Sequence, residues 1–251
     1  DIQKSFHKFA EMATFGVVAN GDDPHTVQAL EGIDYVTFGL GDGNRIHAAN
    51  MCPDWRHFDV LCDGEFYCHL DMGVLGRHNA MNALAASAAA WMMGIPGQAV
   101  SRGLVSFHGA GRRMEFKGKF HGADVYDDYA HHPDEVAATI SAVRDAMPGR
   151  RLVLAFQPHT YSRTSALFDD FVRELSRADV LVLAEIYAAR ERNTIGISSA
   201  DVAEKIPGAV FCETLPEVTE YLRENVREGD VVLTMGAGDI FRAGEALLKS
   251  E

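Results

Sequence analysis

The chain has 251 residues, of which 47% are hydrophobic, so it is long enough to form one large domain or two ordinary domains around buried cores. Its formal net charge of −13 disfavours general binding to nucleic acid or to an anionic membrane, because phosphate groups are met by clustered Lys and Arg. No apolar run approaches the roughly 18 residues of a membrane-spanning helix and no signal peptide is recognisable, so the sequence predicts a cytoplasmic protein.

The first part of the chain predicts a helix followed by a series of strands. An apolar stripe of Phe6, Phe9 and Met12 indicates a helix that is already under way near the first residue. Because the chain begins at Asp1 rather than Met, we expect it to be truncated. Strands are then expected at 17–20, 35–39, 45–50, 57–62 and 66–71, and helices at 78–93 and 97–107.

The four cysteines show neither a C-x-x-C pair nor a zinc-binding spacing. A three-residue turn around Gly64 would place Cys62 and Cys68 on one apolar face of a hairpin, together with Phe66. In that register the two cysteines lie diagonally, about 7 to 8 Å apart. A disulfide needs closer Cα atoms, so we expect buried, reduced thiols.

A glycine-containing break at 109–111 divides the chain, and we place a domain boundary near residue 111. After it, near-continuous apolar strands alternate with amphipathic helices. Such strands are buried on both faces, which indicates a mostly parallel sheet with helices on either side. We therefore predict an α/β protein with an incomplete α/β domain in residues 1–111 and a Rossmann-like domain in residues 112–251. The expected buried strands are 152–156, 180–183 and 231–234.

The most informative stretch is DDYAHHP at 127–133, which follows an expected strand and precedes a helix that opens with proline and acids. Ligands bind at the carboxyl ends of strands in open α/β sheets. Asp128, Tyr129 and His131 are therefore candidates for a ligand site. The alternative is a cluster of Asp and His that only caps the helix and solvates a loop.

A second passage from strand to helix, FQPHTYSRT at 156–164, carries His159 and Arg163. The free N–H groups at the start of a helix attract carboxylate or phosphate. We expect this strand to neighbour the one that ends at Asp128, so that the two segments face one cleft. The glycine-containing run 236–240 is only a fragment of a dinucleotide-binding pattern, because Arg242 replaces its last glycine, and we interpret it mainly as a tight turn.

Two further motifs suggest a nucleotide. The run GRHNAMN at 76–82 opens an alanine-rich helix and places His78, Asn79 and Asn82 near one face, where they could read a purine edge or could equally cap the helix. Arg112 and Arg113 follow the glycine break and could hold phosphate or carboxylate in a bidentate manner. The alternative is that these two arginines brace the linker.

Taken together and in this order, the motifs resemble those of the Mur ligases, the ATP-dependent amide-forming enzymes of peptidoglycan synthesis. The resemblance covers nearly all of the chain, including the runs 18–24 and 185–191. It implies that residues 1–111 are the last part of the central ATP-binding domain and that residues 112–251 are the C-terminal Rossmann-like domain. The phosphate-binding loop and the metal ligands would lie before Asp1, since no G-x-x-x-x-G-K-[ST] loop occurs here.

The resemblance implies that the lactyl carboxylate of UDP-N-acetylmuramate accepts the γ-phosphoryl group of ATP and that the amine of L-alanine attacks the acyl phosphate. Positioning and charge neutralisation do most of such work. ATP and Mg²⁺ are the cofactors that this implies, with no metal ligand in the chain itself. The matching nucleotide-binding positions are His78, Asn79, Asn82, Arg112, Arg113 and Asp128. Those for alanine and the acyl phosphate are Tyr129, His131, His159 and Arg163, and the catalytic ones are Arg113, Asp128 and His131.

Thr160 departs from family members that carry arginine between the His and Tyr of this motif, so Arg163 would bind the amino-acid carboxylate more alone. Two other functions remain open. The chain could be a non-catalytic module that binds an adenine nucleotide, or part of the muropeptide-recycling ligase, which joins a tripeptide to the same sugar nucleotide. The His159 motif and the run 187–191 favour the alanine enzyme. The sequence does not indicate an oligomeric state.

Overall fold

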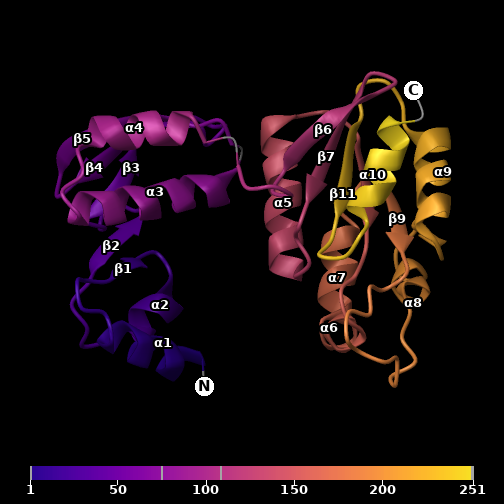
Figure 1. The fold of residues 1–251 in the computed structure, drawn as a ribbon, viewed down its shortest axis with the longest axis horizontal. Helices are drawn as coiled ribbons and strands as arrows, with labels where there is room; N and C mark the ends of the chain where they lie inside the picture. Colours follow the sequence, from indigo (N-terminus) through magenta and orange to yellow (C-terminus); the bar gives the residue numbers. More distant parts are fainter. Residues whose placement is uncertain (1, 75, 108, 250–251) are drawn as a thin grey trace. The chain divides into compact units, whose positions relative to one another are not determined.

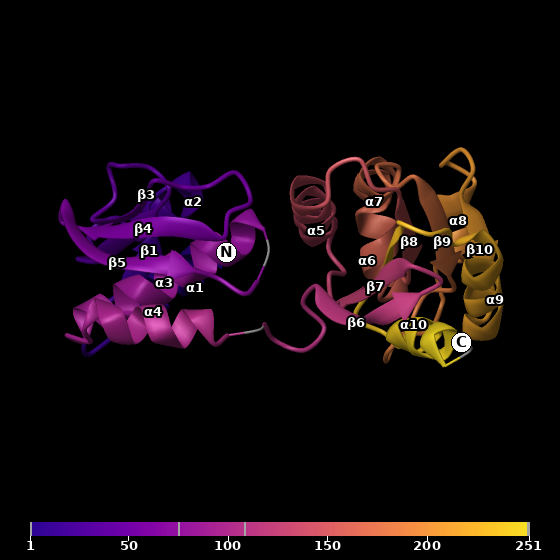
Figure 2. The ribbon, with the colours of Figure 1, turned by 90° about the horizontal axis from the view of Figure 1, so that it is seen from above.

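The computed structural model describes residues 2–74, 76–107 and 109–249, and it forms two compact α/β units, Asp1–His108 and Gly109–Glu251 (Figures 1 and 2). Each unit contains one sheet and its own hydrophobic core. The predicted α/β class is therefore confirmed. Within the described ranges, no helix has both the length and the apolarity needed to cross a bilayer.

The first unit has a mixed sheet in the order β1-β2-β3-β4-β5, in which β1 to β3 run parallel and β3 to β5 antiparallel. Its strands are β1 (Val18–Asn20), β2 (Val36–Gly39), β3 (Ile46–Ala49), β4 (His57–Cys62) and β5 (Glu65–Asp71). Its helices are α1 (Ile2–Glu11), α2 (Pro24–Ala29), α3 (Arg77–Met92) and α4 (Gly97–Val105).

The alanine-rich helix α3 lies against this sheet (Figure 2). Its inward side chains, such as Ala80, Ala83 and Leu84, are buried with Phe58 and Leu70 of the hairpin strands. The small side chains let the helix lie close to the sheet, and this packing positions the first turn of α3. By contrast, α1 forms where the apolar stripe predicts a helix, but that stripe is largely exposed in the chain as described.

Helix α2 was not predicted, because only strands were expected between residues 17 and 71. The carboxylate of Asp23 accepts hydrogen bonds from the backbone N–H groups of His25 and Thr26, both at 3.2 Å, and Pro24 occupies the first helical position. Six residues are too few for a visible apolar period, so the N-cap pattern was the only signal of this helix.

The loop of the β4–β5 hairpin is shorter than predicted. Cys62 pairs with Glu65, which leaves a two-residue loop of Asp63 and Gly64 rather than a three-residue turn. Both loop residues have positive φ, 49° and 82°, as the Asp-Gly type I′ turn requires. The expected turn was therefore wrong by one residue.

The register of the β4–β5 hairpin shifts by one residue, through a bulge, between Leu61 and Val60. Cys68 therefore lies opposite Val60, and its side chain faces the core. Phe66 lies between the hairpin loop and the bulge, and its side chain is 64% exposed. Its predicted place on the apolar face was therefore wrong. Cys62 and Cys68 are buried free thiols, as predicted. Burial raises the pKa of Cys62 to about 12 and that of Cys68 to about 11, so both remain protonated and unreactive.

The second unit is a six-stranded sheet in the order β10-β9-β8-β11-β7-β6, parallel except for the edge strand β6. Its strands are β6 (Glu115–Phe120), β7 (Ala123–Asp128), β8 (Leu152–Phe156), β9 (Val180–Ala184), β10 (Val210–Cys212) and β11 (Val231–Met235). Its helices are α5 (Pro133–Ala146), α6 (Tyr161–Ala166), α7 (Phe168–Leu175), α8 (Ser199–Ala203), α9 (Leu215–Asn225) and α10 (Phe241–Leu248).

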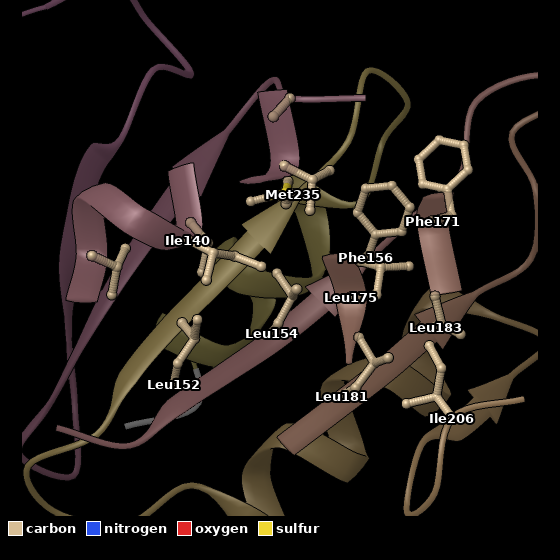
Figure 3. Packing of buried hydrophobic residues seen from close by; sticks show 14 of the residues in the cluster. Ile140, Leu152, Leu154, Phe156, Phe171, Leu175, Leu181, Leu183, Ile206 and Met235 are labelled. Carbon is tan, nitrogen blue, oxygen red and sulfur yellow. The ribbon is translucent and has the colours of Figure 1, made fainter. Parts of the chain in front are cut away.

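Helices cover both faces of this sheet. Side chains of α5, α7 and α8 pack with alternate residues of β8, β9 and β11 in the cluster that Figure 3 shows. Side chains of α9 and α10 pack with the other residues of the same strands. Every residue of β8 and β11 is consequently buried, which confirms the predicted parallel sheet.

The order of the strands differs from the expectation in one respect that matters for the site. The last strand, β11, lies between β7 and β8, so the strands that end at Asp128 and Phe156 are not neighbours. Met235 of β11 is in register with both of these residues. The loops that follow β7 and β8 therefore leave the same edge of the sheet, one strand apart.

Candidate functional site

The carboxyl edge of the second sheet carries a row of four rings. Tyr129 and His131 follow β7, with centroids 5.4 Å apart and planes nearly perpendicular at 79°. His131 lies 5.9 Å from His159, which follows β8. His159 in turn stacks on Tyr187, which follows β9, at 5.7 Å and 19°. Three loops that are distant in sequence thus converge, as expected of a ligand site at this edge.

The two histidines after β7 have different roles in the fold. His132 is the N-cap of α5, and its ring accepts a hydrogen bond from the N–H of Asp134. Glu135 completes the capping box through the N–H groups of His131 and His132, at 2.9 and 3.2 Å. Nδ1 of His131 lies 3.0 Å from the backbone oxygen of Tyr129, and its ring neighbours that of His159, so His131 is not the cap of the helix.

His159 and Arg163 each carry a buried nitrogen that lacks a hydrogen-bond partner among the described residues, Nδ1 and Nη1 respectively. Burial lowers the pKa of His159, and the neighbouring charges of Arg163 and His131 lower it further, although Glu191 opposes them. A buried polar group without a partner is costly in free energy. This pair is therefore suited to an anion or a polar ligand that would complete the missing contacts.

The start of α6 is held by a protein carboxylate. Glu191, from the loop after β9, accepts hydrogen bonds from the N–H and the hydroxyl of Ser162, at 2.9 and 2.5 Å. These contacts lower the pKa of Glu191. The N–H of Ser162 is thus engaged by Glu191, so the side chains of His159 and Arg163 are the better candidates to meet a ligand.

Asp128 is buried, at 3% exposure, and its carboxylate accepts hydrogen bonds from protein donors on both oxygens. The N–H of Met114 donates to one oxygen at 2.8 Å, while the N–H of Ala130 and the hydroxyl of Thr139 donate to the other at 2.8 and 3.4 Å. Asp128 therefore links the segment before β6 with the loop after β7 and with α5. These hydrogen bonds help to fix the loop that carries Tyr129 and His131.

Arg112 donates three hydrogen bonds within the unit. Its guanidinium reaches the carboxylate of Asp127 at 2.7 Å and the carbonyl oxygens of Gly236 and Gly238 at 2.6 and 3.1 Å. It also lies over the rings of Tyr129 and Phe241, 5.1 and 4.7 Å from their centroids. Arg112 thus braces the end of the linker against the turn after β11.

Arg113 also lies near Tyr129 and is exposed. Its guanidinium is 5.7 Å from the ring centroid of Tyr129, which is 37% exposed. Burial raises the pKa of Asp127, the partner of Arg112, while hydrogen bonds from Arg112 and Thr234 oppose that rise. Of the two arginines, Arg113 is consequently the better placed to meet a ligand.

Two N–H groups of the turn after β11 are engaged by a side chain of the protein. The side-chain oxygen of Gln157 accepts hydrogen bonds from the N–H groups of Asp239 and Ile240, at 2.9 and 3.1 Å. A Cβ at Gly236 would lie 2.5 Å from the backbone oxygen of Gln157, so glycine is needed for this close approach. The interpretation as a tight turn between strand and helix is confirmed.

In the first unit, the predicted nucleotide contacts lie in the first turns of α3. The amide of Asn82 donates to the side-chain oxygen of Asn79 at 3.4 Å, so these two share one face of the helix, and His78 is half-buried beside them. The N-cap position is Gly76, with φ 95° and no side-chain cap, so it is not one of these polar residues. Across residues 2–74, 76–107 and 109–249, no cluster of His, Cys, Asp or Glu is arranged to hold a metal ion.

Three residues of the site were not assigned from the sequence, namely Gln157, Tyr187 and Glu191. Each belongs to a run that contributed to the resemblance, at 156–164 or 185–191, but neither run indicates which side chain meets His159. Their contacts depend on pairing between loops after β8, β9 and β11, which no local pattern encodes.

Comparison with known proteins extends over both units. The family profile described as "Mur ligase, glutamate ligase domain" matches residues 112–238, and that described as "Mur ligase middle domain" matches residues 1–90. A UDP-N-acetylmuramate–L-alanine ligase of Lachnospira eligens is 47% identical over 265 residues, covering 99% of this chain and 57% of that protein. Its counterpart in Clostridium novyi is 40% identical over 261 residues, covering 100% of this chain and 57% of that protein.

Among solved structures, the UDP-N-acetylmuramate–alanine ligase MurC of Thermotoga maritima matches with a TM-score of 0.80 at 26% identity, over 99% of this chain and 54% of that one. A murein peptide ligase of Psychrobacter arcticus has the same fold, with a TM-score of 0.72 at 20% identity, over 99% of this chain and 54% of that one. The chain thus spans little more than half the length of these relatives. Two matched family domains, which together cover most of the sequence, show that the chain belongs to the Mur ligase family.

Proposed function

We propose that this chain provides the amino-acid site and part of the nucleotide site of a cytoplasmic, ATP-dependent ligase that joins L-alanine to the lactyl carboxylate of UDP-N-acetylmuramate. The named relatives, similar over the whole chain, support this choice of substrates. The observation that carries it is a pair of buried nitrogens, Nδ1 of His159 and Nη1 of Arg163, that have no hydrogen-bond partner in the described part of the chain, near the ring of His131.

The proposed roles follow from charge and burial. Arg163 holds the carboxylate of L-alanine, because a guanidinium pairs well with a carboxylate and its Nη1 lacks a partner among the described residues. His159 is kept neutral by its surroundings, so it can accept a hydrogen bond or a proton from the amine of L-alanine. His131 and Tyr129 close the other end of the row of rings and orient the carboxylate being activated.

ATP, when bound, supplies the phosphoryl group that converts the lactyl carboxylate into an acyl phosphate. In the first unit, His78, Asn79 and Asn82 would hold the adenine, since they lie together at the start of α3. In the second unit, Arg113 would meet the phosphates. Arg112 and Asp128 act indirectly, by fixing the segments on which Arg113, Tyr129 and His131 lie. Mg²⁺ would accompany the phosphates of ATP, and the described residues offer it no cluster of ligands.

The test is a ligase assembled from this chain and the upstream part of the Clostridium novyi relative. We expect phosphate release that requires ATP, UDP-N-acetylmuramate and L-alanine together, with little release when a tripeptide replaces alanine. A preference for the tripeptide would identify the recycling ligase. Calorimetric binding of an ATP analogue without any amino-acid-dependent phosphate release would instead identify a nucleotide-binding module.

A further inference from the structure

The backbone of Tyr187 is paired with the segment that carries His159. The N–H of Tyr187 donates to the oxygen of Pro158, and the N–H of Thr160 donates to the oxygen of Tyr187, both at 2.9 Å. These bonds form an isolated parallel bridge between Tyr187 and His159 beyond the ends of β8 and β9. The two side chains are therefore held in register, although neither lies in a regular strand.

The ring of Tyr187 has His159 and Gly238 as neighbours. It stacks on the imidazole, with centroids 5.7 Å apart and planes 19° from parallel. A Cβ at Gly238 would lie only 2.7 Å from Cγ of Tyr187 and 2.3 Å from Oε1 of Gln157. Cβ and Cγ of Tyr187 thus lie against the backbone of Gly238. A larger residue at position 238 would not fit without a shift of its neighbours.

The turn under this ring is itself fixed. Gln157 is buried, at 5% exposure, and holds the N–H groups of Asp239 and Ile240. Arg112 holds the carbonyl oxygen of Gly238 from the other direction, at 3.1 Å. The position of Gly238 beside Tyr187 is therefore fixed by hydrogen bonds from two directions along the turn.

His159 depends on such packing for its orientation. Its Nδ1 is buried without a hydrogen-bond partner among the described residues, so no contact at that atom sets the direction of the ring. Its other ring neighbour, His131, is tilted by 59° and offers no parallel face. The ring of Tyr187 is the near-parallel surface against which the imidazole lies.

We propose that Tyr187, supported by Gly238, is a positioning residue that fixes the imidazole of His159 in the orientation needed to meet L-alanine. The proposal rests on the function proposed above for the significance of His159, but the positioning itself is a property of this chain. It requires the ring of Tyr187 and not its hydroxyl. Phenylalanine at position 187 should therefore keep the imidazole of His159 in this orientation, whereas leucine should not.

The first experiment is NMR of this chain labelled at histidine. The His159 signals to compare are its side-chain couplings, because the ring-current shift of the tyrosine disappears with its ring whether or not that ring positions the imidazole. In Tyr187→Leu we expect these couplings to average over rotamers. In Tyr187→Phe these signals should stay close to those of the unchanged protein. In Gly238→Ala the added Cβ would lie 2.3 Å from Oε1 of Gln157 and 2.7 Å from Cγ of Tyr187, so we expect this variant to disturb both the turn after β11 and the ring.

Tyr129→Leu is the matched control. Tyr129 and Tyr187 are similarly exposed, at 37% and 39%, and stand at opposite ends of the row of rings. This control should alter the signals of His131 and leave those of His159 in place. Unchanged His159 signals in Tyr187→Leu would overturn the proposal, as would a Tyr187→Phe protein that behaves like Tyr187→Leu. If Gly238→Ala fails to fold, the two Tyr187 variants alone decide.

The second experiment measures initial rates in the assembled ligase. Tyr187→Leu should raise the KM for L-alanine about three- to tenfold, which is the effect expected from losing one aromatic pair, while Tyr187→Phe stays within about twofold. A changed His159 signal with an unchanged KM would uphold the positioning and contradict the proposed role of His159. An unchanged signal would contradict the positioning whatever the kinetics.

Discussion

The imidazole rings of His131 and His159 lie 5.9 Å apart, although β11 separates the strands that precede them. Two imidazolium charges at this distance would repel each other, and Arg163 adds a third positive charge near His159. The site therefore favours a neutral His159 and has a positive charge beside it. Under the proposed function, Arg163 would pair with the carboxylate of L-alanine and the neutral imidazole would accept a hydrogen bond from its amine.

This arrangement makes stability depend on pH. Burial and the nearby positive charges lower the pKa of His159, so between that value and the ordinary histidine pKa of about 6.5 the unfolded chain binds more protons than the folded one. The contribution of His159 is thus fully present above about pH 6.5 and is lost as pH falls through its lowered pKa.

Urea unfolding at about pH 7.5 and about pH 5.5 measures this contribution. We expect the midpoint to fall less with acid in His159→Gln than in the unchanged chain. His25→Gln, a change at an exposed histidine, should keep the full acid sensitivity. Equal sensitivity of the His159→Gln and unchanged proteins would show that His159 is not held neutral.

The ion pair between Arg112 and Asp127 predicts a large loss of stability when only one of the two residues is replaced. The side chain of Asp127 is 2% exposed, so Arg112→Met leaves a buried carboxylate without its cation and should cost about 3 kcal/mol in the free energy of unfolding. Adding Asp127→Asn removes that charge and should recover most of the loss. Arg173→Met, at a side chain that is 62% exposed, should change stability by less than about 0.5 kcal/mol.

Denaturant unfolding of these variants decides the role of the arginine. If Arg112→Met is as stable as the unchanged chain, the guanidinium does not brace the turn after β11. Its assignment as a direct nucleotide contact would then regain support.

Thr160 adopts φ 69°, which is strained for a β-branched residue, at the position between His159 and α6. Thr160→Gly should therefore raise the free energy of unfolding by about 1 kcal/mol, because glycine reaches this conformation without strain. Thr194→Gly, in an exposed loop without positive φ, should lower it by about 0.5 kcal/mol. A loss of stability in Thr160→Gly would indicate that the side chain stabilises this turn.

The sequence predicted those parts of the fold that depend on local periodicity. Continuous apolar runs identified β8 and β11, whose residues are all buried, and Pro133 with its following acids located the start of α5. The register of the β4–β5 hairpin was wrong because a bulge depends on packing across strands rather than on either strand alone. The position of β11 between β7 and β8 likewise depends on the order of strands in the sheet, which local residue patterns do not predict.

The candidate site was predictable in the same limited sense. Residues at strand ends, such as His131 and His159, could be placed at one edge because parallel strands share their carboxyl edge. Whether Arg112 meets a ligand or a carbonyl oxygen of Gly236 depends on a contact across 124 residues, so the sequence left both possibilities open. The same holds for Tyr187, whose significance arises from the ring that it faces.

The most direct test of the account is the KM for L-alanine in the assembled ligase carrying Arg163→Ala. Because Arg163 is proposed to pair with the carboxylate of alanine, we expect KM to rise about 10- to 100-fold with a much smaller change in kcat. Arg223→Ala, at an exposed arginine of α9, should leave both constants unchanged. An unchanged KM for L-alanine in Arg163→Ala would contradict the proposed site.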